Sequence, residues 1–217
     1  EQMDRRDGVE TARLDGNSVH EAFVEAASMA KIAFAVNTIV DGGGAVTDVF
    51  CGNWRSSHRA ACDAFAERHN VSIQEKRELV IASCGGYPFD INMIQAHKSL
   101  EAASKACTDG GTIVLLAECR DGLGRDDFLN WFEADDSNAL AKRLCEKYQV
   151  NGQTAWSFLK KAERFRIAMV SSLDEGTINK LRSKKLLAGD VETLINETTR
   201  GYFIPNASKL LIETSSS

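Results

Sequence analysis

Gln95 and Lys98 are the two side chains whose types and spacing best suit binding chemistry in this sequence. They lie three residues apart in a segment that we expect to be helical, so they are neighbours on one helix face. An ammonium group beside an amide donor suits a small carboxylate or another small anion. Upstream, Gly85-Gly86 follows an apolar run at residues 79–83, which predicts a strand and a sharp turn ahead of the helix.

The start of this helix limits how an anion can be held. Pro88 cannot lie inside the helix and Asp90 is suited to cap it, so we predict Ile91 as the first helical residue. Lys98 then lies about 10 Å along the axis, since each residue adds about 1.5 Å. The helix terminus and Lys98 therefore cannot both contact one small carboxylate. We expect the ammonium of Lys98, which leans back toward the N-terminus, to meet it about one turn below the cap.

A solvated helix face is the simplest alternative explanation for Gln95 and Lys98. The opposite face carries the residues that we assign to the sheet: Met93, Ala96, Leu100, Ala103 and Cys107. However, Ile91 and Ile94 share the side of the polar pair, which is unusual for a face that meets only water. The pattern favours a cleft wall or a domain interface, with an apolar floor and two polar groups that orient a ligand.

The residue types that bind metals or act as nucleophiles are scattered along the chain. Six cysteines form no C-x-x-C pair: Cys51, Cys62, Cys84, Cys107, Cys119 and Cys145. We interpret them as single buried thiols in a reducing cytoplasm. The four histidines, His20, His58, His69 and His97, do not share the i, i+4 spacing of a helical metal site. We therefore expect no metal ligands in this chain.

A short charged segment follows one of the predicted strands. Glu118 and Cys119 end that strand beside Arg120 and Asp121, a position where catalytic residues of α/β proteins often lie. An ion pair that fixes the following loop explains the same residues equally well. Both interpretations stay open at the level of the sequence.

The composition indicates an ordinary globular protein. The chain has 217 residues, 43% of them hydrophobic and 26% charged, with a formal charge of −5. Lys and Arg are dispersed, without the basic patch that nucleic-acid binding requires. No window approaches the roughly 18 apolar residues of a transmembrane helix, and residues 1–18 lack the apolar core of a signal peptide. We expect a cytoplasmic protein with neither nucleic acid nor membrane as a partner.

The order of the predicted elements indicates an α/β fold. Residues 18–31, preceded by Asn17 as the cap, predict an amphipathic helix. The next elements are a hairpin and a helix, at residues 32–40, 45–51 and 54–69. Beyond a polar boundary at residues 72–78, short apolar runs alternate with helical segments: strands at 79–83, 112–117 and 166–170, and helices at 90–107, 126–148, 154–161 and 191–199. This alternation predicts a mostly parallel sheet covered by helices, preceded by a smaller α/β segment that contains the β-hairpin.

Several of these motifs together resemble the C-terminal domain of nickel-dependent lactate racemases. They are Gly85-Gly-Tyr-Pro88, Asp90-Ile-Asn92, Gln95 with Lys98, residues 110–119 and Gly122-Leu-Gly124. Two further motifs resemble the region just ahead of that domain: Leu14-Asp-Gly-Asn17 with Glu21, and Cys51-Gly-Asn53 with His58-Arg59. The resemblance implies that residues 1–72 are the remainder of an N-terminal cofactor domain, 73–78 a hinge and 79–200 a C-terminal, substrate-closing domain. Residues 201–217 would be a tail that could return to the first unit.

The resemblance also implies a division of labour between domains. In that family a nickel-pincer nucleotide, held in the N-terminal domain, takes hydride from a 2-hydroxy acid and returns it. No segment here resembles the cofactor motif, so no cofactor is expected on this chain alone. Gln95 and Lys98 match family residues that contact the hydroxy acid, and Trp156 is expected at another wall of the pocket, where a core tryptophan is an equally good explanation. Ile94 stands where relatives often have an aromatic residue, which leaves the identity of the hydroxy acid open.

Two functional hypotheses follow. In the first, the chain is the C-terminal part of a 2-hydroxy-acid racemase or epimerase and holds the substrate carboxylate, while an N-terminal domain carries the cofactor and the acid/base histidines. In the second, it is a standalone, non-catalytic α/β module that binds a metabolite. A nucleotide-dependent oxidoreductase is disfavoured because Gly85-Gly86 lacks the spacing of a G-x-G-x-x-G motif.

Overall fold

A computed structural model describes residues 8–41, 44–198 and 200–215 of the chain. The chain divides into two compact units, Glu1–Asn70 and Val71–Ser217. This division lies close to the polar boundary expected at residues 72–78. None of the helices in the described part of the chain is long and apolar enough to cross a membrane.

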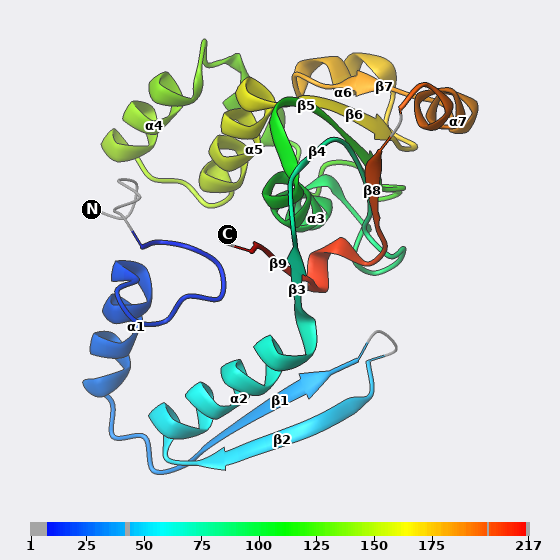
Figure 1. The fold of residues 1–217 in the computed structure, drawn as a ribbon. Helices are drawn as coiled ribbons and strands as arrows, with labels where there is room; N and C mark the ends of the chain where they lie inside the picture. The colour runs from blue at the N-terminus through cyan, green and yellow to red at the C-terminus, as the bar shows by residue number, and fades with distance from the viewer. Residues whose placement is uncertain (1–7, 42–43, 199, 216–217) are drawn as a thin grey trace. The chain divides into compact units, whose positions relative to one another are not determined.

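The first unit consists of two helices and a β-hairpin (Figure 1). Helix α1 (Ser18–Ser28) begins after Asn17, whose side chain accepts hydrogen bonds from the backbone amides of Val19 and His20, as the sequence predicts. Antiparallel strands β1 (Ala35–Val40) and β2 (Val46–Gly52) form the predicted hairpin. Helix α2 (Trp54–His69) has the predicted bounds and packs on one face of the hairpin.

The second unit is built on a five-stranded parallel sheet. Its spatial order is β7 (Lys184–Lys185), β6 (Arg166–Val170), β5 (Cys107–Leu116), β4 (Arg77–Ser83) and β8 (Gly201–Ile204). Every neighbouring pair is parallel, which confirms the predicted fold class. The strands read as apolar runs because both faces of the central strands are covered.

Helices cover the two faces of this sheet. Helix α3 (Met93–Ala106) packs on β4 and β5, and α5 (Gly152–Arg164) packs on β6 and on α3. Helix α7 (Ala188–Glu197) covers the opposite face, where its partly buried apolar residues pack against Leu79, Ile81 and Val114 (Figure 1). The remaining elements are α4 (Ser137–Glu146), α6 (Glu175–Lys180), the 3-10 turns η1 (Phe128–Glu133) and η2 (Ala207–Lys209), and a separate pair of strands, β3 (Asn70–Ile73) with β9 (Leu211–Thr214).

The end of the chain differs from the expected tail. Residues 201–204 form strand β8, which pairs in parallel with β4, so this segment belongs to the main sheet of the second unit. Residues 74–76 separate β3 from β4 and lie inside the expected hinge. Strands β3, β7 and β8 are each four residues long or shorter, too short to produce a recognisable period in the sequence.

Candidate functional site

The predicted binding face lies on the first two turns of α3. Met93, Ala96 and Leu100 are completely buried, so the face that we assigned to the sheet is confirmed. Ile94 and Gln95 are half-buried and Lys98 is exposed. The side chains that the sequence predicted for ligand contact therefore lie on the part of the helix that the sheet leaves open.

Both polar groups on this face are available to a ligand. Lys98 forms no ion pair with any residue in the described ranges, and the side-chain amide of Gln95 forms no hydrogen bond there. By contrast, Lys161 of α5 is buried, and its Nζ lies 2.5 Å from Oε2 of Glu101, one turn further along α3. The helix thus carries one carboxylate that pairs with α5 and, before it, two donors whose side chains form no hydrogen bond or ion pair with the described residues.

The structure corrects the predicted cap of α3. Asn92, not Asp90, is the N-cap: its side-chain oxygen accepts a hydrogen bond from the Gln95 amide at 3.0 Å, and the helix begins at Met93 rather than Ile91. The carboxylate of Asp90 is buried and its Oδ2 accepts a hydrogen bond from the Glu118 amide at 3.0 Å. Asp90 turns away from the helix because its partner lies at the end of β5.

Backbone hydrogen bonds continue this attachment between the loops after β4 and β5. The Cys119 amide donates to the Asp90 carbonyl and the Asp121 amide donates to the Ile91 carbonyl, each at 2.9 Å. The Met93 amide in turn donates to the Gly122 carbonyl at 3.0 Å. Four hydrogen bonds, including that of the Asp90 carboxylate, therefore hold the first turn of α3 against the end of β5.

The glycines of these loops allow close packing. Gly85 has φ +88°, and a Cβ built on it would lie 2.1 Å from Oδ1 of Asn206, just after β8. A Cβ on Gly124 would lie 2.7 Å from Cγ of Asn92, the cap of α3. Ligands of open α/β sheets often bind where the strand order reverses, here between β4 and β8. Asn206 already occupies that position beside Gly85, so these glycines serve the architecture and the open donors lie further along α3.

Two cation–aromatic pairs that the sequence did not predict line the same end of the sheet. The guanidinium of Arg120 lies 4.1 Å from the ring centroid of Tyr87, and Nζ of Lys209 lies 4.2 Å from that of Phe89. The partners are more than 30 residues apart in the sequence, so no local spacing could indicate them. Both pairs attach the loop after β4 to its neighbours.

The charged segment after β5 works mainly through its backbone. The carbonyl of Glu118 accepts hydrogen bonds from the hydroxyls of Ser171 and Ser172 and from the Ser172 amide. Among the residues that the structure describes, Glu118, Arg120 and Asp121 form no ion pair. The loop is thus fixed by hydrogen bonds to the end of β6 rather than by the ion pair considered above.

Trp156 lies on α5 and is 7% exposed. The ammonium of Lys160 lies 5.2 Å from its ring centroid. So little of the indole is open that Trp156 could offer a ligand only an edge. Its burial is what a core tryptophan requires, and its assignment to a pocket wall stays a prediction.

Buried thiols in this unit are poor nucleophiles. Burial raises the pKa of Cys84 to about 12 and the pKa values of Cys107 and Cys119 to about 11. These groups are therefore thiols at neutral pH rather than the thiolates that bind metals or attack substrates. All six cysteines are free, but only these three are fully buried; Cys51 and Cys145 are exposed. Within the described residues no group of three or more His, Cys, Asp and Glu side chains could hold a metal ion.

The comparisons with known proteins agree with this architecture. Residues 73–195 match the family model described as the lactate racemase C-terminal domain. Lactate racemase from Thermoanaerobacterium thermosaccharolyticum is 36% identical over 138 residues, which are 63% of this chain and 32% of that protein. Lactate racemase from Lactiplantibacillus plantarum is 36% identical over 127 residues, 58% of this chain and 30% of that protein.

Solved structures extend the match beyond the family domain. The apoprotein structure of the T. thermosaccharolyticum lactate racemase superposes with a TM-score of 0.89 at 25% identity, over 98% of this chain and 53% of that one. A Thermotoga maritima protein shares the fold, with a TM-score of 0.66 at 14% identity. The chain spans about a third of the length of the two curated relatives and about half of the solved racemase. This chain belongs to the lactate racemase family and contains its C-terminal domain.

Proposed function

We propose that this chain is the substrate-holding C-terminal part of a 2-hydroxy-acid racemase or epimerase. The observation that carries the proposal is the pair of open donors on α3, Gln95 and Lys98, in a chain of the lactate racemase family. The family motifs around them fasten the first turn of α3 to the end of β5. That attachment gives the two donors a rigid base, which a binding site needs.

The donors suit the carboxylate of a 2-hydroxy acid. The ammonium of Lys98 supplies the charge, the amide of Gln95 adds a neutral hydrogen bond, and Ile94 offers an apolar contact for the rest of the molecule. A racemase must leave both faces of the reacting carbon accessible, because hydrogen leaves one face and returns to either. Binding through the carboxylate end satisfies this requirement, since it fixes the substrate without covering either face of the carbon.

The chemistry at the reacting carbon is assigned to another part of the protein. The relatives extend well beyond the part that the chain matches. We therefore place the nickel-pincer nucleotide and the acid/base groups in an N-terminal domain of the same protein. Residues 73–78 would act as the hinge, so that the C-terminal domain closes on the substrate and excludes water.

The test is a Lys98→Ala substitution in the protein encoded by the full natural reading frame, loaded with cofactor. Losing a charged hydrogen bond of about 1.5–3 kcal/mol should reduce kcat/KM for D- and L-lactate, or for a larger 2-hydroxy acid, by about 10- to 100-fold. Gln95→Ala removes a neutral hydrogen bond and should cost less, about 2- to 10-fold.

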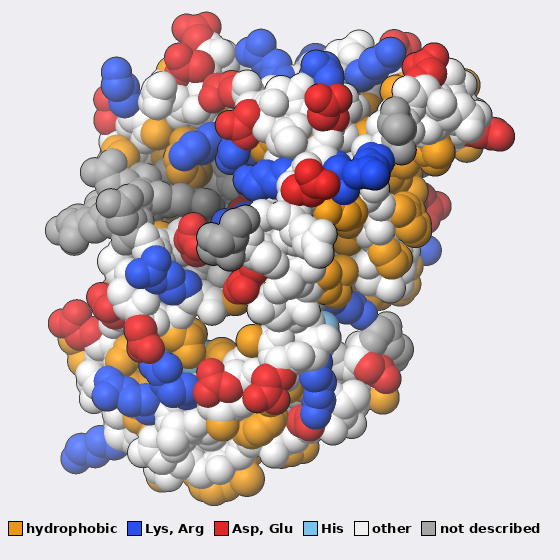
Figure 2. Space-filling view, viewed as in Figure 1, with side chains coloured by type: hydrophobic (Ala, Val, Ile, Leu, Met, Phe, Trp, Pro, Cys, Tyr) orange, Lys and Arg blue, Asp and Glu red, His pale blue; other side chains and the backbone are white. Residues whose placement is uncertain are grey.

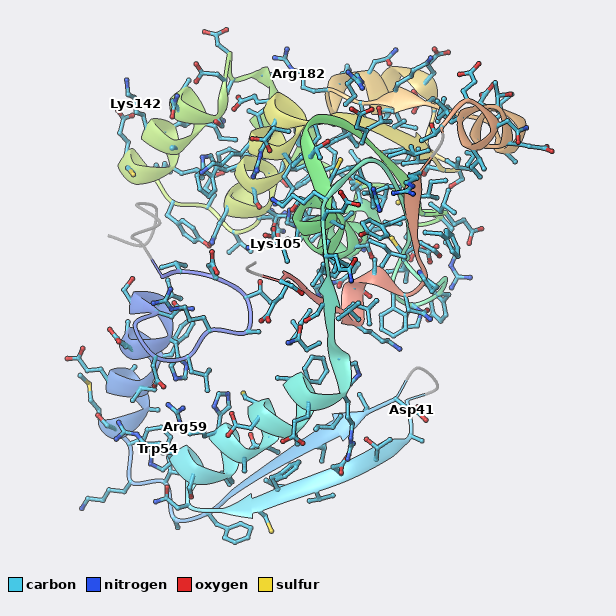
Figure 3. All side chains as sticks on the ribbon, viewed as in Figure 1. Asp41, Trp54, Arg59, Lys105, Lys142 and Arg182 are labelled. Carbon is cyan, nitrogen blue, oxygen red and sulfur yellow. The ribbon has the colours of Figure 1, made fainter. Side chains whose placement is uncertain are left out.

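Lys105 provides the control for this experiment. It is an exposed lysine two turns further along the same helix (Figure 3), so Lys105→Ala changes the net charge equally and should leave kcat/KM within about twofold. Racemisation is followed by polarimetry. If Lys98→Ala keeps wild-type kcat/KM, Lys98 does not hold the substrate. A full-length protein that binds hydroxy acids without turnover would instead favour a binding module.

A further inference from the structure

The first unit has almost no core of its own. Within its described residues, Ile39 is the single buried hydrophobic side chain, and α1 contains no buried residue at all. The one buried residue of α2 is Ser57, whose hydroxyl accepts a hydrogen bond from Asn37 at 3.0 Å. Large hydrophobic side chains are exposed instead: Phe23, Met29, Ile32, Phe34, Val36, Val40, Val46 and Val49. A segment of about 70 residues needs far more buried apolar surface than this to fold independently.

The exposed valines gather on one face of the hairpin. Val36 lies opposite Cys51, Val40 opposite Val46 and Val49 opposite Thr38, so their side chains project from the same face. Val36, Val40, Val46 and Val49 are 51–61% exposed. We call these four residues the hairpin outer face. Helix α2 packs on the inner face, and hydrophobic side chains lie open at the surface of this unit (Figure 2).

A cavity of about 580 Å³ lies between the helices of the same unit. Its apolar wall includes Phe23 and Val24 of α1 and Ala35 of β1, and Trp54 and Arg59 of α2 extend toward it (Figure 3). Two strands alone also leave an unpaired edge on each side of the hairpin, and an isolated hairpin is marginally stable in water. Among its own described residues, this unit therefore covers neither the outer face of the hairpin nor its strand edges, and it leaves the cavity between its helices unfilled.

We infer that the hairpin outer face is the docking surface for the part of the full-length protein that this chain does not contain. The solved racemase matches 98% of this chain yet is covered only to 53%, so a polypeptide of nearly equal length accompanies this fold there. The occupant presents an apolar layer of helix or strand, because the four valines offer no charge to pair. This inference rests on the proposed function only in requiring a longer protein, and it does not require racemase activity.

Hydrogen exchange tests the inference without an activity measurement. The 217-residue chain and the protein encoded by the full natural reading frame are compared by mass spectrometry. Amides of β1 and β2 should exchange at least 100-fold more slowly in the longer protein, while those of β4 and β5 exchange alike in both. Equal exchange of the hairpin amides in the two proteins, or a reading frame that encodes no further polypeptide, would overturn the inference.

A charged double variant locates the surface. Val36→Lys with Val49→Lys should return the hairpin amides of the longer protein to within about threefold of their exchange rates in the 217-residue chain. Val150→Lys is the control, since Val150 is 66% exposed in the second unit and should change nothing. Protection of the hairpin through self-association of the 217-residue chain would assign the face to a second copy and overturn the inference. A longer protein that protects the hairpin but racemises no hydroxy acid would overturn the proposed function alone.

Discussion

Replacing Asp90 with Ala tests how the donor-bearing turns of α3 are held. The Asp90 residue is 6% exposed, and Oδ2 is the acceptor for the Glu118 amide at 3.0 Å. The substitution leaves that amide without its charged acceptor, although the backbone bond from Cys119 to the Asp90 carbonyl stays. A buried hydrogen bond to a charged group contributes about 1.5–3 kcal/mol. We expect the free energy of unfolding of the second unit to fall by about 2–3 kcal/mol.

Urea unfolding followed by tryptophan fluorescence gives this value, because Trp131 and Trp156 are buried in the second unit. Asp90→Asn keeps an oxygen acceptor without the charge and should cost about 1 kcal/mol. Asp121→Asn is the control: its side chain is exposed, and its backbone bond to Ile91 is unaffected, so the change should stay within about 0.5 kcal/mol. If Asp90→Ala also stays within about 0.5 kcal/mol, the carboxylate does not anchor α3.

Three further perturbations probe the same unit. Burial raises the pKa of Cys84 from 9.0 to about 12, so its contribution to stability is complete below about pH 9 and is lost as the pH rises toward 12. The thermal midpoint should therefore fall less steeply between these pH values in Cys84→Ala than in the unsubstituted protein. An unchanged slope would exclude this thiol as a cause of the loss of stability. Gly85 has φ +88°, and Gly85→Ala would place a Cβ 2.1 Å from Oδ1 of Asn206, which should cost about 2 kcal/mol or more in urea unfolding. An added Asn206→Gly should restore about half of this loss. No recovery would show that the strain lies elsewhere. Glu101→Ala removes the carboxylate beside the buried ammonium of Lys161, which keeps its hydrogen bonds to Ser157, and should cost about 3 kcal/mol. Pairing it with Lys161→Met should recover most of that loss; a coupling below about 0.5 kcal/mol in the double-mutant cycle would show that the pair contributes little.

The fold class was predictable because its signals are local. The strands at residues 79–83 and 166–170 read as short apolar runs bounded by helical segments, and β4 and β6 lie at those positions. The apolar stripe of α3 likewise predicted which face meets the sheet. Strand β8 was missed because four residues carry too little pattern, and its pairing with β4 joins segments about 120 residues apart.

The candidate site was predictable only in part, for a related reason. Helical spacing placed Gln95 and Lys98 together and away from the sheet. The predicted capping role of Asp90 was wrong. A carboxylate just before a helix can cap that helix or accept a hydrogen bond from elsewhere, and the sequence does not distinguish the two. Here the partner is the Glu118 amide, 28 residues away, and Asn92 caps the helix. The contact of Lys209 with Phe89 depends on the return of the chain through β8 in the same way.

The hairpin shows how a local pattern can predict an element and still leave its surroundings unknown. The outward residues of the hairpin, such as Val36 and Val49, are mostly apolar and carry no charge, whereas the inward residues include Asn37 and Asp48 beside Ile39 and Phe50. A hairpin with one solvated face alternates apolar with polar residues, whereas strands buried on both faces are apolar throughout. The outward valines are therefore unusual for a face that meets only water, and α2 covers the inner face alone. An apolar layer on this face, as proposed above, would complete the packing of the hairpin.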